Sequence, residues 1–324
     1  MANFMYLLGA GASRNALPVV SEFSDSVNEL AGKYGTFVAT SNIDKELEPE
    51  SDFHSTHLRI LDDLKWLADI ASPLKNASID TYAKKLYLRR SHDELHRLKL
   101  AVWVYFTIAQ CMKPHDLRYD KLFASLLTLS TRGEIELPQN LRIVTWNYDM
   151  QLEIAYFDYC RIKDDALRKI TFSDSIVRLN GLASMHHRRR TLSSTDCLFK
   201  TFGTDSILAI VDDYKSYKDN FTYSIISLGF AWEQSEDVIT SDLERVCKDV
   251  DTLIIIGYSF PFFNRSIDKI LFDKLISLRK IYIQALTGEH RGIMERIGAL
   301  TNKRYDITPL DDYSQFYIPH DIQI

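Results

Sequence analysis

The chain has 324 residues, of which 46% are apolar and 26% charged, so it can bury one large hydrophobic core or two smaller ones. Its formal net charge of -5 at pH 7 excludes a general electrostatic attraction to nucleic acid or to an acidic membrane surface. We therefore expect no direct nucleic-acid partner and no membrane partner, and any anion-binding site must be a local feature.

The N-terminal sequence lacks the features of a secretory signal. Met1 leads almost directly into apolar residues 4–8, with no basic segment and no small-residue cleavage site. The longest apolar stretch, residues 100–109, is far shorter than the roughly 20 residues that cross a bilayer. A cytoplasmic protein is the expectation.

The four cysteines stand dozens of residues apart and include no Cys-x-x-Cys pair. They are Cys111, Cys160, Cys197 and Cys247. Because zinc sites need clustered Cys and His ligands, we expect buried thiols and no metal.

Six short apolar runs have the length and spacing of buried parallel strands. They cover residues 4–8, 141–145, 176–179, 223–228, 253–256 and 280–285. Helical stretches separate them, which is typical of a doubly wound α/β sheet. Ligands of such sheets bind at the carboxyl ends of the strands, so the polar turns after these runs are the candidate site.

The segment between the first two runs is much longer than one crossover helix requires. Its helical patterns cover residues 53–70, 79–90 and 93–112. We interpret the chain as a single domain over residues 1–324, with a helical module at approximately residues 25–138 inserted into the sheet or packed beside it.

The first run ends in Gly9-Ala10-Gly11-Ala12-Ser13. Glycines let the chain turn and approach a ligand closely, and backbone N–H groups at a helix N-terminus could converge on a phosphate. A plain tight turn is the alternative, because a Gly-x-Gly string alone is a weak signal. Its place directly behind the first strand favours a phosphate loop.

The second run ends in Thr145-Trp146-Asn147-Tyr148-Asp149. Alternation along an extended chain sends Asn147 and Asp149 to one side and Trp146 to the other. A carboxamide beside a carboxylate could hold ribose hydroxyls and an amide. The alternative is a helix N-cap, where Asn and Asp are favoured.

A third loop, Gly257-Tyr258-Ser259, closes the run at residues 253–256, and Asn264 and Asp268 follow at the start of a helix. It is a second candidate loop for a phosphate or a ribose, or, taken alone, a structural turn. Three such loops on one sheet would meet in one crevice, and their joint occurrence indicates a nucleotide site.

Together the three loops resemble those of the SIR2-like family, which includes the sirtuin deacylases and, closer to this chain, bacterial SIR2-like NADases that act as antiphage defence effectors. The resemblance spans nearly the whole chain. The matching motifs are Gly-Ala-Gly-x-Ser at Gly9 to Ser13, Thr-x-Asn-x-Asp at Thr145 to Asp149, Gly-x-Ser at Gly257 to Ser259, and a segment of the defence proteins' helical region at Ser78-Ile79-Asp80-Thr81.

The resemblance implies a Rossmann-like, SIR2-like fold that takes NAD as its substrate and uses no metal. Asn147 would hold the nicotinamide ribose and a water, Asp149 would support the nicotinamide end, and Asn180 is the third candidate catalytic residue. The implied NAD-binding residues are Gly9, Ala10, Gly11, Ala12, Ser13, Thr145, Gly257, Tyr258 and Ser259, with Ser13 and Ser259 on phosphate or ribose.

Two departures argue against a deacylase. Arg14-Asn15-Ala16-Leu17-Pro18 stands where sirtuins have Gly-x-x-Asp-Phe-Arg, and the cysteine-based zinc module is missing. A peptide-binding cleft is therefore not expected.

A third departure concerns the general base. Where the family has His-Gly after a strand, this chain has Asn180-Gly181. Asparagine cannot take a proton near neutral pH, so Asn180 could position a hydroxyl or water without acting as a base. His186 or His187, beside the basic run at residues 188–190, could substitute; the alternative is a solvated loop.

The resulting expectation is an NAD hydrolase that yields ADP-ribose and nicotinamide as a regulated effector of bacterial antiphage defence. A regulatory protein partner, homo-oligomerisation or both would restrain it, because the sequence shows no sensor domain. The alternative is a catalytically weak or inactive subunit that binds NAD or ADP-ribose in a larger defence complex. A dehydrogenase is disfavoured, since its fingerprint needs a third glycine near Arg14.

Overall fold

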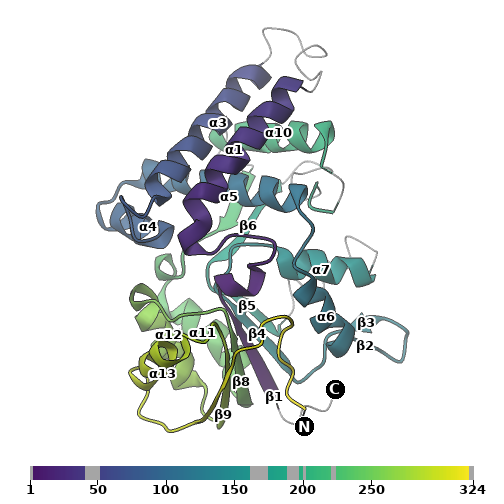
Figure 1. Ribbon diagram of the computed structural model, residues 1–324, viewed down its shortest axis with the longest axis vertical. Coiled ribbons are helices and arrows are strands. Elements are labelled where there is room, and N and C mark those ends of the chain that lie inside the picture. Colours follow the sequence, from purple (N-terminus) through teal and green to yellow (C-terminus); the bar gives the residue numbers. More distant parts are fainter. Residues whose placement is uncertain are drawn as a thin grey trace.

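The computed structural model describes residues 3–40, 52–160, 174–187, 197–199, 202–219 and 224–320. Its centre is a six-stranded parallel sheet with the strand order β10-β9-β8-β1-β4-β5 (Figure 1). The strands are β1 (Asn3–Leu8), β4 (Leu141–Thr145), β5 (Ile176–Arg178), β8 (Val250–Ile256), β9 (Lys280–Gln284) and β10 (Asp306–Leu310).

Numbered along the chain, these six strands follow the doubly wound order 3-2-1-4-5-6 of Rossmann-like folds. The chain starts at β1 in the middle, builds outward through β4 and β5, and then returns to the other side of β1 with β8. The expected parallel α/β sheet is confirmed. Its winding direction reverses at β1, so the crevice for a ligand opens at the carboxyl ends of β1 and β8.

Helices cover both faces of the sheet. One face packs against α6 (Leu117–Leu126) and α7 (Gln151–Cys160), and the other packs against α11 (Glu236–Cys247), α12 (Arg265–Lys274) and α13 (His290–Gly298).

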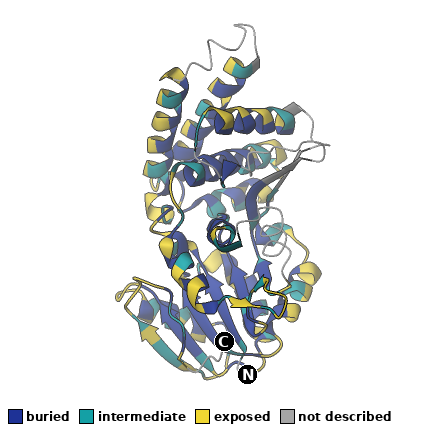
Figure 2. Ribbon diagram, turned by 90° about the vertical axis from the view of Figure 1, so that its right-hand side faces the viewer, coloured by how far each residue is buried: buried dark blue, intermediate teal, exposed yellow. Residues whose placement is uncertain are grey.

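Alternation along β1 shows why both layers form. Phe4, Tyr6 and Leu8 join the core on the α6 side, whereas Met5 and Leu7 join the core on the α11 side. All five side chains are buried, and Figure 2 shows the strands in the middle of the sheet in dark blue. An unbroken apolar run is therefore the pattern of a strand covered on both faces.

A second layer of helices lies beyond the carboxyl ends of the strands (Figure 1). Between β1 and β4 the chain forms α1 (Phe23–Thr40), α3 (Asp52–Ala71), α4 (Ile79–Leu88) and α5 (His92–Met112). Residues 100–110 of α5 are all buried, because α1, α3, α10 (Thr204–Asp219) and a hairpin enclose the helix. Since α10 and the hairpin follow β5, this layer is not built only from the segment between the first two strands.

The run at residues 223–228 was wrongly expected in the parallel sheet. It forms β7 (Ser224–Leu228), which pairs antiparallel with β6 (Gly181–His187) in a separate two-stranded sheet. Leu228, at the end of this strand, is buried in the core of the helical layer. A short hairpin of β2 (Thr128–Leu129) and β3 (Ile135–Glu136) was not anticipated either.

Strand β10 was not predicted from the sequence. It is an edge strand with partly exposed side chains, so it lacks the continuous apolar run of a buried strand. It even contains Pro309, which cannot donate a ladder hydrogen bond and is tolerated at an edge.

Among the described residues, no helix has both the length and the apolar character needed to cross a membrane. The four cysteines are free; Cys197 and Cys247 are buried as expected, whereas Cys111 and Cys160 are partly exposed.

Candidate functional site

The loops after β1, β4 and β8 line one cleft with an empty volume of about 1020 Å³. The helical layer forms its opposite wall. Of the residues predicted from the sequence, the cleft brings together Gly9, Ala10, Ser13, Asn147, Asp149, Asn180, Gly257, Tyr258 and Ser259. Gly11 lines a neighbouring cavity instead, and Ala12 and Thr145 are buried.

The glycines allow the loops after β1 and β8 to pack against each other. Gly9 N donates to Ile256 O at 3.0 Å, and Gly11 N donates to Gly257 O at 3.1 Å. A Cβ atom on Gly11 would lie 2.6 Å from the Gly257 Cα, and one on Gly9 would lie 2.5 Å from the Gly257 O. The role of Gly11 thus differs from the expected one, because a side chain at this position would clash with the backbone of Gly257 before it reached a ligand.

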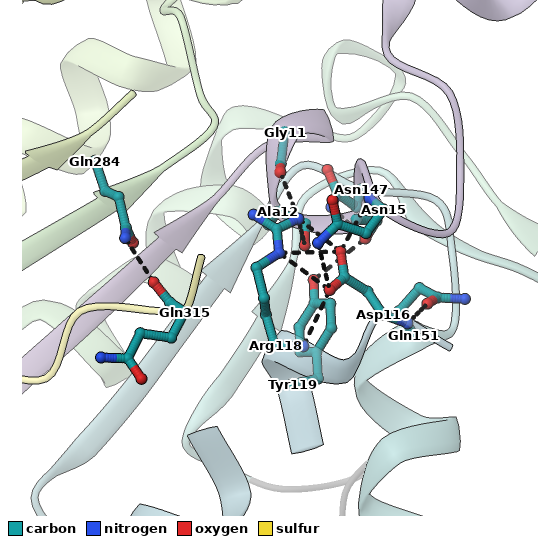
Figure 3. A network of polar contacts seen from close by, with 11 residues as sticks. Gly11, Ala12, Asn15, Asp116, Arg118, Tyr119, Asn147, Gln151, Gln284 and Gln315 are labelled. Atoms are coloured by element: carbon teal, nitrogen blue, oxygen red, sulfur yellow. Dashed lines mark hydrogen bonds and ion pairs between the residues drawn. The ribbon is translucent and has the colours of Figure 1, made fainter. Parts of the chain in front are cut away.

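A buried ion pair holds the carbonyl side of the loop after β1 (Figure 3). Arg118 Nη2 donates to Gly11 O at 3.0 Å and to Ala12 O at 3.1 Å, and it lies 2.6 Å from Asp116 Oδ2. Asp116 also accepts from the backbone N of Asn15 at 3.1 Å. Neither charged residue was singled out in the sequence, because an Asp and an Arg at a helix start resemble ordinary capping residues.

Asn147 is fixed by the loop after β1 and by its own turn. Its Nδ2 donates to Ser13 Oγ at 3.4 Å, and Ser13 Oγ lies 3.3 Å from the hydroxyl of Tyr119. The backbone N of Asn147 donates to Thr145 Oγ1 at 3.0 Å. Thr145 therefore shapes the turn, while the carboxamide of Asn147 forms part of the cleft wall.

Asp149 combines the two roles that were considered for it. Its Oδ1 accepts from Gln151 N at 3.1 Å at the start of α7, and its partly exposed side chain also lines the cleft. Burial raises the pKa of Asp149 to about 6, although hydrogen bonds from the Gln151 backbone and the Ser13 side chain oppose the rise. Above that pH the cleft carries a negative charge beside Asn147.

Asn180 joins two other loops through its side chain. Its Nδ2 donates to Trp146 O at 2.9 Å, and its Oδ1 accepts from Ala231 N at 3.0 Å, at the start of the 3-10 turn η3 (Ala231–Glu233). The residue is buried and touches the cleft. Its amide therefore holds these two loops together at the edge of the site.

Tyr258 lines the cleft, and neighbouring side chains contact both its ring and its hydroxyl. The ring stacks on Trp146 with a centroid distance of 5.6 Å and an interplanar angle of 14°. Its hydroxyl donates to Asp268 Oδ1 at 2.9 Å and accepts from Asn264 Nδ2 at 3.2 Å. Burial raises the pKa of Asp268 to about 8.

Ser259 is exposed and borders both the cleft and a neighbouring cavity along Gly11, Gln284 and Glu289. This second cavity continues the cleft past the loops after β1 and β8. Three residues line both the cleft and the second cavity: Ala10, Gly257 and Ser259. An elongated ligand could therefore extend across the two loops.

A carboxylate that the sequence did not assign to catalysis faces the same cleft. Asp80 lies in the first turn of α4, where Ser78 Oγ caps the helix by accepting from Thr81 N at 3.1 Å. The hydroxyl of Tyr148 donates to Asp80 Oδ1, and both residues line the cleft. This contact connects the helical layer to the loop that carries Asn147.

The two histidines considered as substitutes lie in strand β6. The backbones of His186 and His187 pair with Ile225 and Ser224. Residues 188–190 of the basic run lie outside the described residues. Within the described part of the chain, no group of three or more His, Cys, Asp or Glu side chains could hold a metal ion.

No protein-family model matches the chain, and no curated protein matches it either. The geometry of the cleft and the motifs of its loops therefore carry the functional argument.

Proposed function

We propose that the chain is an NAD hydrolase of the SIR2-like kind, which converts NAD to ADP-ribose and nicotinamide in the cleft at the carboxyl ends of β1, β4 and β8. One observation carries the proposal: Asn147 and Asp149 share a cleft wall with the glycine loop of a 3-2-1-4-5-6 sheet, at its switch point.

For this reaction the protein mainly has to position the ribose and supply a charge that stabilises the developing positive centre. The bond between the ribose C1′ and the pyridinium nitrogen breaks, its electron pair moves to that nitrogen, and nicotinamide leaves neutral without needing an acid. Asn147 would hold the ribose, and the carboxylate of Asp149 would stabilise the oxocarbenium-like centre that develops at C1′.

Control of the activity belongs to the proposal. An unrestrained NAD hydrolase would deplete the cell that makes it, so we propose a cytoplasmic effector of antiphage defence, restrained by a protein partner or by homo-oligomerisation.

The test is to incubate the purified protein with NAD, alone and with the proteins encoded beside it, and to quantify free nicotinamide. We expect release of nicotinamide under at least one condition and none from Asn147→Ala under the same condition. Equal release by the variant would contradict the site, and no release by the wild type would contradict the function.

A binding subunit is the second candidate, and Asn180 is the observation that favours it. Its amide is engaged with the backbone at both ends and cannot accept a proton near neutral pH. Calorimetry that shows tight binding of NAD or ADP-ribose, without nicotinamide release under any partner condition, would favour this candidate.

A further inference from the structure

A group that accepts a proton from the attacking water would accelerate the proposed hydrolysis, and Asn180 cannot be that group. The cleft offers two carboxylates, one on each wall. Asp149 comes from the loop after β4, and Asp80 comes from α4 in the helical layer.

The two carboxylates differ in what already binds them. The side chain of Asp149 caps α7 through Gln151 N, beside Ser13 and Asn147. At Asp80 the only side chain that donates, within the described part of the chain, is Tyr148. A backbone N–H also donates to Asp80, so each carboxylate has one side-chain donor and one backbone donor, and Asp80 is the one to which the proposed reaction has so far given no role.

The surroundings of Asp80 suit proton transfer. Burial raises the pKa of Asp80, and the hydrogen bond from Tyr148 opposes this rise. The titratable groups that face it are Tyr148 on the loop after β4 and Tyr258 on the loop after β8, with Glu233 of η3 beyond Tyr148. The charge of Asp80 also contributes to raising the pKa of Tyr258, and both residues line the cleft.

We propose that Asp80 is the general base that activates water in this cleft, an inference that rests on the proposed NAD hydrolysis. The water oxygen forms a bond to the ribose C1′ as the C1′–N bond breaks and its electron pair moves to the pyridinium nitrogen. The water proton passes to the carboxylate of Asp80 and is then released to solvent. Tyr148 is a positioning residue that holds this carboxylate.

The test compares two Asp→Asn variants with the wild type. Asp80→Asn keeps an oxygen that can accept from Tyr148 but removes the base. Asp93→Asn is the matched control, because Asp93 is exposed and follows Ser91 in the first turn of α5 as Asp80 follows Ser78 in α4. Both changes remove one charge from a helix N-terminus.

We expect Asp80→Asn to lower kcat by roughly 10²- to 10⁴-fold, the usual contribution of general acid–base catalysis, with the Kd for NAD changed by less than about 3-fold. Asp93→Asn should keep the kcat of the wild type. Tyr148→Phe supplies a second readout: without the hydrogen bond that lowers the pKa of Asp80, the acid limb of the pH profile of kcat should move to higher pH.

A kcat of Asp80→Asn within a few-fold of the wild type would overturn the base while leaving NAD hydrolysis intact. Loss of NAD affinity, or a fall in melting temperature absent from Asp93→Asn, would overturn it in favour of a structural role. An unmoved acid limb in Tyr148→Phe would also count against it. If the wild type binds NAD and never releases nicotinamide, the hydrolase proposal itself fails, and the base fails with it.

Discussion

Gly11 and Gly257 pack backbone to backbone, and this contact aligns the two loops that frame the cleft. A Cβ atom on Gly257 would lie 2.3 Å from the Cα of Gly11, and Gly257 has a φ of +60°. A side chain on either residue would push the loops apart, and at Gly257 it would also strain the backbone.

The first prediction follows from this contact. Gly11→Val should lower the free energy of unfolding by about 2 kcal/mol or more and weaken NAD binding, because Gly257 cannot move aside without displacing the end of β8. Thermal unfolding and titration calorimetry would measure the two effects. Gly292→Ala is the control: nothing lies within 4 Å of its added Cβ, and it lies inside helix α13. It should stabilise by about 0.5–1 kcal/mol. Wild-type stability in Gly11→Val would contradict the close contact.

Asn147→Ala should abolish NAD loss while the protein remains folded. The change removes the carboxamide from the cleft wall, and the only side-chain bond lost among the described residues is the long contact with Ser13, so the stability cost should be about 1 kcal/mol or less. Nicotinamide release and the melting temperature are the measurements. Ser13→Ala removes the same bond from the other side, together with the bonds of Ser13 to Tyr119 and Asp149, but leaves the carboxamide of Asn147 in place.

Asn180→Ala should destabilise the protein by about 1–3 kcal/mol, because the buried Trp146 O and Ala231 N would each lose a partner. Activity should fall with it, since both loops border the cleft. Asn180→His introduces a side chain that can accept a proton and should keep or raise nicotinamide release, by roughly 10- to 100-fold if the histidine works as a base. If Asn180→Ala keeps the wild-type activity while His186→Ala or His187→Ala abolishes it, the base lies in β6.

The buried Asp268 should make stability depend on pH. Its pKa is about 8 in the folded protein and near 3.8 when exposed, so between these values the folded state binds the extra proton. The stability that this proton contributes is present below about pH 4 and is lost as pH rises toward 8. Asp268→Asn, which stays neutral and can accept from Tyr258, should flatten this slope and gain about 1–3 kcal/mol at pH 8. Urea unfolding at pH 5 and pH 8 would test it; parallel pH slopes for the two proteins would contradict the assignment.

Local patterns in the sequence were sufficient for the parallel strands and for the loops that end them. Five of the six apolar runs lie in the parallel sheet, since a strand covered on both faces needs a continuous apolar run and a turn needs glycine or short polar residues. The meeting of Asn147 and Asp149 with the loop after β1 follows from the rule that parallel strands end at the same edge.

Only the tertiary structure decided which residues complete the site. Arg118 binds Gly11 across 107 positions of sequence, and Tyr148 binds Asp80 across 68. The tertiary structure also brings Asn180 to its two backbone partners and places β7 outside the parallel sheet. Such contacts depend on how whole helices and strands pack, and periodicity within one segment carries no information about the segment that it will meet.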